Sequence, residues 1–135
     1  MTTRTASCAC GRFRLACEGE PIRVSVCNCT ACQRRTGSAF GVAARYPADR
    51  VTLEGESTEY VRTGDEGTKI HFRFCPHCGS TVCWEQPAYG DGIAVAVGCF
   101  ADPGFTPHPI RSIYDASRRH PWVDLKPEGG LERIG

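Results

Sequence analysis

The residues of this chain that are best suited to chemistry are its cysteines, ten among 135 residues. Seven of them fall into three tight groups: Cys8 and Cys10; Cys27, Cys29 and Cys32; Cys75 and Cys78. Thiols two or three residues apart can reach the same metal ion, whereas disulfides do not require such spacing. The first residues contain no apolar stretch of the kind found in secretory signals. We therefore expect a reducing, cytoplasmic environment and metal-bound thiolates.

The first and third groups together predict a closed zinc site. Zinc in structural sites is usually held by four Cys or His ligands. Four thiolates are available from Cys8, Cys10, Cys75 and Cys78. His77 lies within the third group, but we interpret it as an exposed turn residue, because four sulfurs already satisfy the metal. An ion that closes so long a loop would stabilise a small β-domain built from non-local pairings.

The central group predicts a second zinc site of a different kind. It supplies three thiolates, from Cys27, Cys29 and Cys32, and an open fourth position is typical of a catalytic zinc. The alternative is a closed tetrahedron, in which a His or one of the remaining cysteines, Cys17, Cys83 or Cys99, is the fourth ligand. Zinc with three thiolates is a weak Lewis acid, but it can bind a substrate thiol and lower the pKa of that thiol.

Hydrophobic patterns around these groups predict an all-β fold in a single domain, residues 1–135. Alternation predicts strands at 12–17, 22–26, 68–74 and 80–85, and apolar runs predict buried strands at 38–46 and 93–97. Short strands are also expected at 51–53 and 58–62, and a last strand with an aromatic anchor at 113–114 and 121–123.

Two hairpins and one helix should position the cysteines. We expect 12–17 and 22–26 to pair as a hairpin that leads into the central group, with Ile22, Val24 and Val26 facing inward. Residues 75–79 should form the tip of a second hairpin. Residues 30–36 predict the single short helix, which Gly37 would end.

The cysteine groups and their neighbours resemble the motifs of a known family. The matching stretches are 8–11, 27–40, 74–80, 98–103, 113–114 and 121–123. In combination they are similar to the glutathione-dependent formaldehyde-activating enzymes, a family that also includes centromere protein V. The resemblance covers about residues 5–125, and the chain resembles the short form of the family, without long terminal extensions.

This resemblance implies several small coiled antiparallel sheets, a β-tent, stapled by zinc. It also implies an activity: the condensation of glutathione with formaldehyde to S-(hydroxymethyl)glutathione, formally a carbon–sulfur lyase reaction in reverse. It assigns Cys8, Cys10, Cys75 and Cys78 to a structural zinc. It assigns Cys27, Cys29 and Cys32 to a catalytic zinc, which we expect to be exchangeable.

Other residues are candidates for binding and proton transfer. Arg34 and Arg35 follow the central group and could bind glutathione carboxylates, or could instead form a solvated helix face. Candidate proton donors are His71, Tyr114 and His120. Two positions depart from the family pattern: Ser112, where many relatives carry His, and Cys99, where Thr is common.

Composition limits the partners. The net charge is +1, with 16 Lys and Arg against 15 Asp and Glu, which gives no basis for bulk attraction to nucleic acid or to an anionic membrane. The expected partners are a small thiol such as glutathione and a small carbonyl. The alternative is a non-catalytic zinc-stapled module that binds a protein or senses thiol oxidants.

Overall fold

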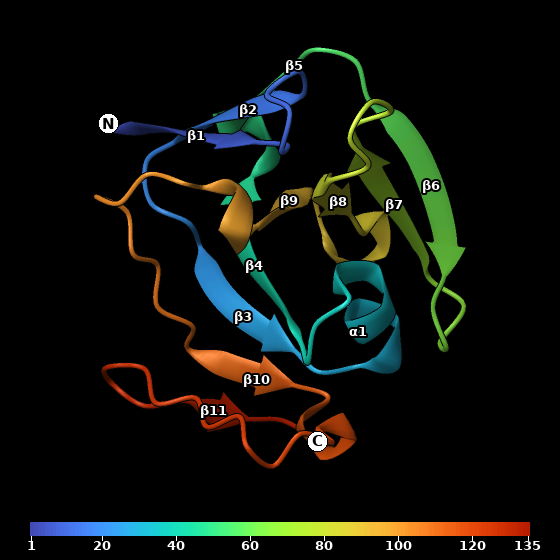
Figure 1. Ribbon diagram of the computed structural model, residues 1–135, viewed down its shortest axis with the longest axis vertical. Coiled ribbons are helices and arrows are strands. Elements are labelled where there is room, and N and C mark those ends of the chain that lie inside the picture. Colours follow the sequence, from blue (N-terminus) through green and yellow to red (C-terminus); the bar gives the residue numbers. More distant parts are fainter.

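Eleven short strands and one α-helix make up the computed structural model, which describes residues 1–135. The strands form two sheets, as Figure 1 shows. The smaller sheet has the order β1 (Thr3–Ser7), β2 (Arg14–Glu18) and β5 (Val51–Glu54). The larger sheet has the order β11 (Glu132–Arg133), β10 (Arg111–Ile113), β3 (Arg23–Cys27), β4 (Gly41–Pro47), β9 (Gly92–Ala96), β8 (Thr81–Glu85), β7 (Lys69–Phe74) and β6 (Thr58–Thr63). The predicted all-β fold class is confirmed.

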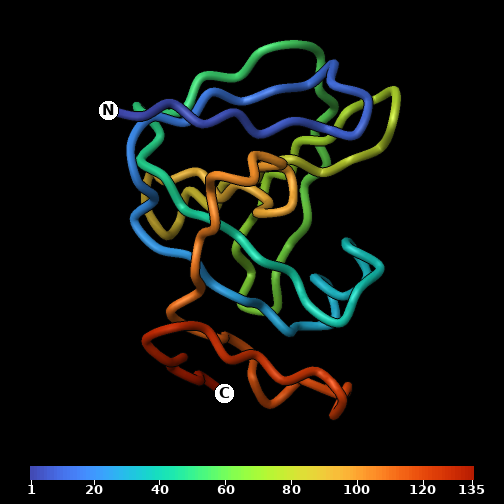
Figure 2. The backbone as a smooth tube through the Cα atoms, turned by 60° about the vertical axis from the view of Figure 1, so that its left-hand side comes forward, coloured from blue at the N-terminus to red at the C-terminus, as the bar shows by residue number.

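Most strand pairs are antiparallel, and the exceptions involve β10. This strand runs parallel to β3 on one side and to β11 on the other. It brings residues from late in the chain against the strand that leads into the central cysteines. In Figure 2 the N-terminal strands and the C-terminal segment lie at opposite ends of the molecule, so β10 forms the junction between that segment and the rest.

The alternation of the central strands separates a core face from an open face. Val24, Ala44, Val95 and Cys83 are neighbours in register across β3, β4, β9 and β8, and all four are buried. They pack in one hydrophobic cluster with Leu15 and Cys17 of β2 and with Phe13, which directly precedes that strand. Successive side chains of a strand point to opposite faces of the sheet. On each of these strands, the residues next to the four buried ones therefore face away from this core.

The helix and the second hairpin agree with the sequence predictions. Helix α1 spans Thr30–Thr36 and ends at Gly37, which has a left-handed conformation with a φ of 65°. Strands β7 and β8 pair antiparallel, with residues 75–80 at the turn. Short 3-10 turns occupy Ala48–Arg50, Pro87–Tyr89, Val97–Cys99 and Asp115–Ser117. No helix here has the length and apolar character needed to cross a membrane.

The predicted hairpin of 12–17 with 22–26 is wrong. Strand β2 pairs with β1 and β5, whereas β3 pairs with β4 and β10. The short connection carries the chain from one sheet to the other through Gly19, which has a φ of 77°. Ile22, expected to face inward, is 56% exposed, because β3 begins only at Arg23 and its alternation does not extend back to Ile22.

The predicted strand at 121–123 is also wrong. Trp122 is 77% exposed and its ring lies 5.6 Å from that of His120. The last strand is instead β11, which has two residues and borders β10. Sequence patterns do not predict β1, which is polar and has a single buried residue, Ala6. Both omitted strands lack the apolar alternation on which strand prediction depends.

Candidate metal centres and the cavity beside them

Four cysteine sulfurs meet where the two sheets approach each other. Cys8 and Cys10 lie in the loop between β1 and β2, and Cys75 and Cys78 lie at the tip of the β7–β8 hairpin. All four Sγ atoms lie within 4.8 Å of one another, with 3.7 Å from Cys8 to Cys10 and 3.6 Å from Cys10 to Cys75. A tetrahedral zinc with Zn–S distances of about 2.3 Å places its sulfurs about 3.8 Å apart. The cluster therefore fits one zinc ion.

Backbone amides support the sulfurs of this cluster. The N–H of Phe13 donates to Cys8 Sγ at 3.2 Å, and that of His77 donates to Cys75 Sγ at 3.4 Å. Gly11 and Gly79 each follow a pair of cysteines with a φ near +80° (82° and 79°), a conformation that disfavours other residues. These turns aim amide hydrogens at thiolate sulfur, which stabilises its negative charge.

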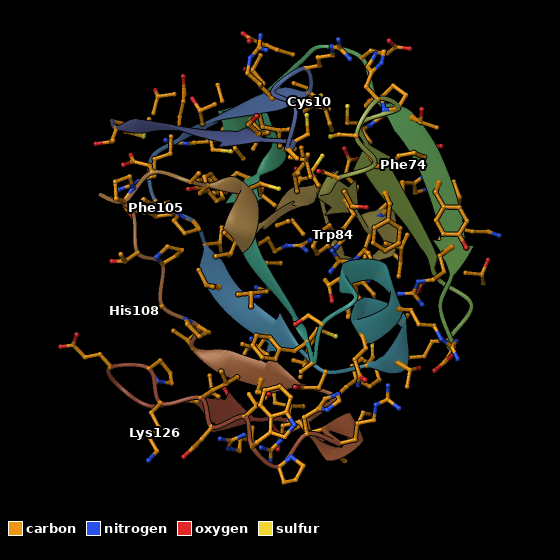
Figure 3. All side chains as sticks on the ribbon, in the orientation of Figure 1. Cys10, Phe74, Trp84, Phe105, His108 and Lys126 are labelled. Carbon is orange, nitrogen blue, oxygen red and sulfur yellow. The ribbon has the colours of Figure 1, made fainter.

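Ser80 connects the two halves of the cluster. Its hydroxyl accepts a hydrogen bond from the Ala9 N–H at 3.1 Å and lies 3.4 Å from Cys78 Sγ. Hydrogen bonding from Ser80 lowers the pKa of Cys78 to about 5. In Figure 3, Cys10 lies at the upper edge of the molecule next to this hairpin tip. His77 is exposed and lies 3.4 Å from Glu56, outside the four-sulfur cluster.

Three further sulfurs form a second cluster at the start of the helix. Cys27 is the last residue of β3, Cys29 is the N-cap of α1, and Cys32 lies in its first turn. Their Sγ atoms lie within 4.8 Å of one another, and the Cys27–Cys29 distance is 3.5 Å. No other Cys, His, Asp or Glu joins this cluster. The arrangement can hold a metal ion with three sulfur ligands.

Hydrogen bonds concentrate negative charge on Cys29. Its side chain accepts from Cys27, and its sulfur accepts the N–H of Cys32 at 3.3 Å. Hydrogen bonds from Cys27 and Cys32 lower the pKa of Cys29 to about 2, and the same contacts raise the pKa of Cys27. The cluster thus holds at least one thiolate at neutral pH.

The other cysteines that were considered as a fourth ligand belong elsewhere. Cys17 and Cys83 are buried in the core cluster, and burial raises the pKa of Cys17 to about 11 and that of Cys83 to about 12. Cys99 packs against the same core, and its thiol lies 3.9 Å from the Thr81 carbonyl oxygen. These thiols act as small apolar side chains.

A buried hydrogen-bond chain fixes the backbone of the second cluster. Asn28, between two of its cysteines, is 2% exposed. Its Nδ2 donates to Ser112 Oγ at 2.7 Å and to the Ile113 carbonyl oxygen at 3.0 Å. Gln33 Nε2 donates to the Asn28 carbonyl oxygen at 2.7 Å, and Arg119 donates to Gln33 Oε1 at 2.8 Å. Ser112, one of the two departures from the family pattern, is therefore a structural partner of Asn28.

A cavity of about 270 Å³ opens beside the three-sulfur cluster. Its lining includes Cys27, Cys29 and Cys32 together with side chains of the open face of the larger sheet. Small residues, Gly41, Ala43 and Ala94, are part of the lining, and Trp84 and Phe72 stand on β8 and β7. Figure 3 shows Trp84 in the interior of the molecule above α1. A small molecule in this cavity can touch the sulfurs and an apolar wall together.

Of the candidate binding and proton-transfer residues, some line the cavity and others lie outside it. Arg35 lines the cavity, with its guanidinium 4.1 Å from the centre of the Trp84 ring, whereas Arg34 is exposed and does not line it. Tyr114 lines the cavity and has a left-handed φ of 50°. His71 pairs with Glu59 at 3.6 Å, and His120 packs on Trp122. Neither histidine lines the cavity.

Sequence patterns did not single out four arginines of the cavity lining: Arg23, Arg45, Arg62 and Arg111. The sequence does contain a signal for Arg23, because the period-2 alternation of a strand puts Arg23, Ser25 and Cys27 on the same face. Arg45 lies opposite Arg23, and Arg111 lies beside Ser25. Those positions depend on strand register and cannot be read from local sequence.

Comparisons with known proteins agree with the resemblance. No protein of curated function matches the chain. A crystal structure of a Rhodobacter sphaeroides protein from a structural genomics programme is similar, with a TM-score of 0.57 and 22% identity over 76% of this chain and 91% of that one; this likeness supports the fold. The family model described as glutathione-dependent formaldehyde-activating enzyme matches residues 3–117. This chain belongs to the glutathione-dependent formaldehyde-activating enzyme family.

Proposed function

We propose that this protein is a zinc-dependent enzyme of the carbon–sulfur lyase type that joins a thiol to a small carbonyl, with glutathione and formaldehyde as the model pair. The observation that carries the proposal is the cluster of Cys27, Cys29 and Cys32, which has no fourth protein ligand and borders a cavity. Cys8, Cys10, Cys75 and Cys78 would hold a structural zinc. Membership of the family supports the same reaction class.

The number of sulfur ligands in each cluster suits the role proposed for it, structural for the four-cysteine cluster and catalytic for the three-cysteine cluster. Four sulfurs complete a tetrahedron, whereas three leave one position for another ligand. A zinc ion held by three thiolates would supply a site that lowers the pKa of a substrate thiol. The hydrogen bonds around Asn28 fix the backbone that carries the three cysteines, and hydrogen-bond partners next to metal ligands tune metal affinity and ligand orientation.

The remaining chemistry is addition of the thiol to the carbonyl. The carbon–sulfur bond forms, the carbonyl π bond breaks, and the proton of the thiol ends on the new hydroxyl oxygen. Of the three candidate proton donors, we favour Tyr114, because it lines the cavity and the two histidines do not. Burial raises the pKa of Tyr114, so its hydroxyl keeps a proton to donate at neutral pH.

A carboxylate group of the thiol needs a cationic partner. Arg35 lines the cavity, and its guanidinium lies against the ring of Trp84. The Nε of Arg35 is buried and has no hydrogen-bond partner. A buried donor without a partner is unfavourable, and a ligand carboxylate would satisfy it. Arg34 lies outside the cavity, so we assign this role to Arg35 alone.

The test combines metal analysis with kinetics. We expect two zinc ions per chain, and formation of the hemithioacetal from glutathione and formaldehyde faster than the uncatalysed reaction. Cys29→Ser should lose one zinc and the rate enhancement while it keeps its fold. Tyr114→Phe should keep both zinc ions and lose rate, by about a hundredfold for a lost general acid. A doubly zinc-loaded protein with a rate equal to background would contradict the proposal and favour the non-catalytic alternative.

A further inference from the structure

Three arginine side chains converge on one end of the cavity. Arg23 on β3 lies directly opposite Arg45 on β4, and residues opposite each other in an antiparallel pair share one face. Arg111 on β10 lies beside Ser25, which is on the same face of β3 as Arg23. All three are half-buried and line the cavity. They come from three adjacent strands, so the cluster is built by the sheet.

None of these arginines is neutralised by the protein. No carboxylate lies within 4.0 Å of any of the three, although nine ion pairs occur elsewhere. The acidic residues of the cavity lining, Asp65 and Glu66, are exposed and belong to the turn between β6 and β7. Burial, and then the charges of Arg111 and Arg45, lower the pKa of Arg23. Like charges on facing positions are destabilising, so the free protein is left with uncompensated positive charge here.

The sheet makes room for this cluster at a glycine. Gly92 on β9 is buried, and a Cβ at this position would lie 2.6 Å from Arg45 Nε and 3.0 Å from its Cζ. The Arg45 side chain therefore lies across the backbone of β9. A larger residue at 92 would displace it from the cavity.

Strand geometry sets the distance from the arginines to the three-sulfur cluster. Arg23 and Cys27 are four residues apart on the same strand face, which corresponds to about 13 Å at about 3.3 Å per residue. Ala43 and Ala94 line the cavity together with both groups. A ligand that touches both ends has a sulfur at one end, a slender middle part and an anion at the other.

We infer that Arg23, Arg45 and Arg111 form a subsite for a compact dianion, and that the thiol substrate of this protein ends in a phosphate monoester. Guanidinium groups bind phosphate oxygens through pairs of charge-assisted hydrogen bonds. Three of them match the double charge and several oxygens of one phosphate. The two carboxylates of glutathione are separate single charges, and one stands beside an ammonium group that this cluster would repel. The inference names the substrate class and rests on the proposed function.

The test uses two thiols that differ only in the phosphate. Pantetheine and 4′-phosphopantetheine serve as probes, and calorimetry on the zinc-loaded full chain measures their affinities. We expect the phosphorylated thiol to bind at least about tenfold more tightly, since the phosphate gains charge-assisted hydrogen bonds. Inorganic phosphate, but not acetate, should compete with it, and the preference should fall as salt increases.

Substitutions assign the effect to the arginines. Arg23→Gln with Arg111→Gln should abolish the preference and leave pantetheine affinity unchanged, while Arg12→Gln, an exposed arginine outside the cavity, should keep it. Circular dichroism should show that the double variant folds. If the double variant does not fold, the single Arg111→Gln variant is used instead, and it should show a partial loss of the preference for the phosphorylated thiol. Equal affinity for the two thiols in the unaltered protein, or a preference that survives the double substitution, would overturn the inference.

Two further outcomes separate this inference from the proposed function. Glutathione that binds as tightly as the phosphorylated thiol, and weakens by the same factor in the double variant, would overturn the inference and assign the arginines to carboxylates. A protein that prefers the phosphorylated thiol but shows no rate above background would support the subsite and contradict only the proposed reaction. Measuring binding and rate on the same preparation distinguishes these results.

Discussion

At the scale of single residues, the position of the clustered cysteines depends on neighbours that carry no sulfur. Asn28 is buried between Cys27 and Cys29 and holds β10 through Ser112 and Ile113. Asp115 in turn accepts a hydrogen bond from Ser112 at 2.9 Å and one from Arg133 at 2.9 Å. A substitution in this chain of contacts should therefore change stability and metal retention together.

Asn28→Ala should destabilise the protein by about 1–3 kcal/mol, because the buried Ser112 hydroxyl loses the Asn28 donor and the Ile113 carbonyl loses one of its two donors. It should also speed the loss of one zinc to a chelator. Denaturant titration and a zinc-release assay measure the two effects. Ser38→Ala, at an exposed residue after the helix, is the matched control. Unchanged zinc release in the Asn28 variant would contradict a role in positioning the ligands.

Asp115 should give the protein a pH-dependent stability. Burial opposes its ionisation, but hydrogen bonds from Ser112 and Arg133 outweigh this and lower the pKa of Asp115 below its ordinary value. A carboxyl whose pKa falls on folding stabilises the fold above its unfolded pKa of about 3.9, and this contribution disappears as the pH falls through the folded pKa.

The difference in unfolding free energy between the unaltered protein and Asp115→Asn should thus be largest near neutral pH and shrink below about pH 4. Comparing the two proteins cancels the loss of zinc that both suffer in acid. Asp124→Asn, in an exposed ion pair with Lys126, should show almost no difference at any pH. A difference for Asp115→Asn that stayed constant from neutral to acidic pH would count against the argument.

At the scale of elements, two tight turns deliver sulfur ligands to the four-cysteine cluster. The loop between β1 and β2 and the tip of the β7–β8 hairpin each contain a glycine with positive φ, Gly11 and Gly79. Neither has an atom within 4 Å of a would-be Cβ. The constraint at both positions is therefore conformational and not steric.

Gly79→Ala should cost about 1 kcal/mol of stability, the usual penalty for an alanine forced into a left-handed conformation. Gly98→Ala is a matched control, since Gly98 also has open space around it but no positive φ. Thermal unfolding of the zinc-loaded variants measures both. Equal melting temperatures for the two variants would show that the turn tolerates another conformation.

Local sequence patterns predicted the helix and the cysteine turns, because the residues that determine each of these structures lie within a few positions of one another. Helix 30–36, its end at Gly37 and the hairpin tip at 75–79 are of this kind. The partners of β2 and β3 were not foretold, because the connection between them changes sheet. The arginine cluster depends on a parallel pairing with β10, which no local signal encodes.

At the scale of the whole molecule, the four-cysteine cluster connects the two sheets. Cys8 and Cys10 come from the smaller sheet, and Cys75 and Cys78 from the larger one. Apolar contacts of the core and the hydrogen bond from the Ala9 N–H to Ser80 Oγ also connect the two sheets. A zinc ion bound there would therefore act as a cross-link between two parts of the fold, in addition to its effect on either loop.

Cys10→Ser should loosen the smaller sheet more than the larger one. Cys10 is exposed, so this substitution removes a ligand without disturbing the core. Hydrogen exchange should become faster in β1, β2 and β5 than in β3, β4 and β9, because the smaller sheet then docks without the metal cross-link, through apolar contacts and the Ala9–Ser80 hydrogen bond. Cys29→Ser, which affects only the three-sulfur cluster, should leave the ratio of hydrogen-exchange rates between the smaller and the larger sheet unchanged. An equal acceleration in both sheets would contradict the cross-link.

The parallel placement of β10 against β3 also has a consequence for biosynthesis. Asn28 and its partner Ser112 are 84 residues apart, so at about 5–20 residues per second the ribosome needs roughly 4–17 s to go from one to the other. During that interval the nascent chain gains the last four of its seven clustered cysteines, up to Cys78, while β3 has a free edge and the cavity lacks Arg111 and Tyr114. Cys27, Cys29 and Cys32 are therefore synthesised before the strand that borders Cys27 in the finished fold, and a metal ion that binds them at this stage would do so before β10 pairs with β3.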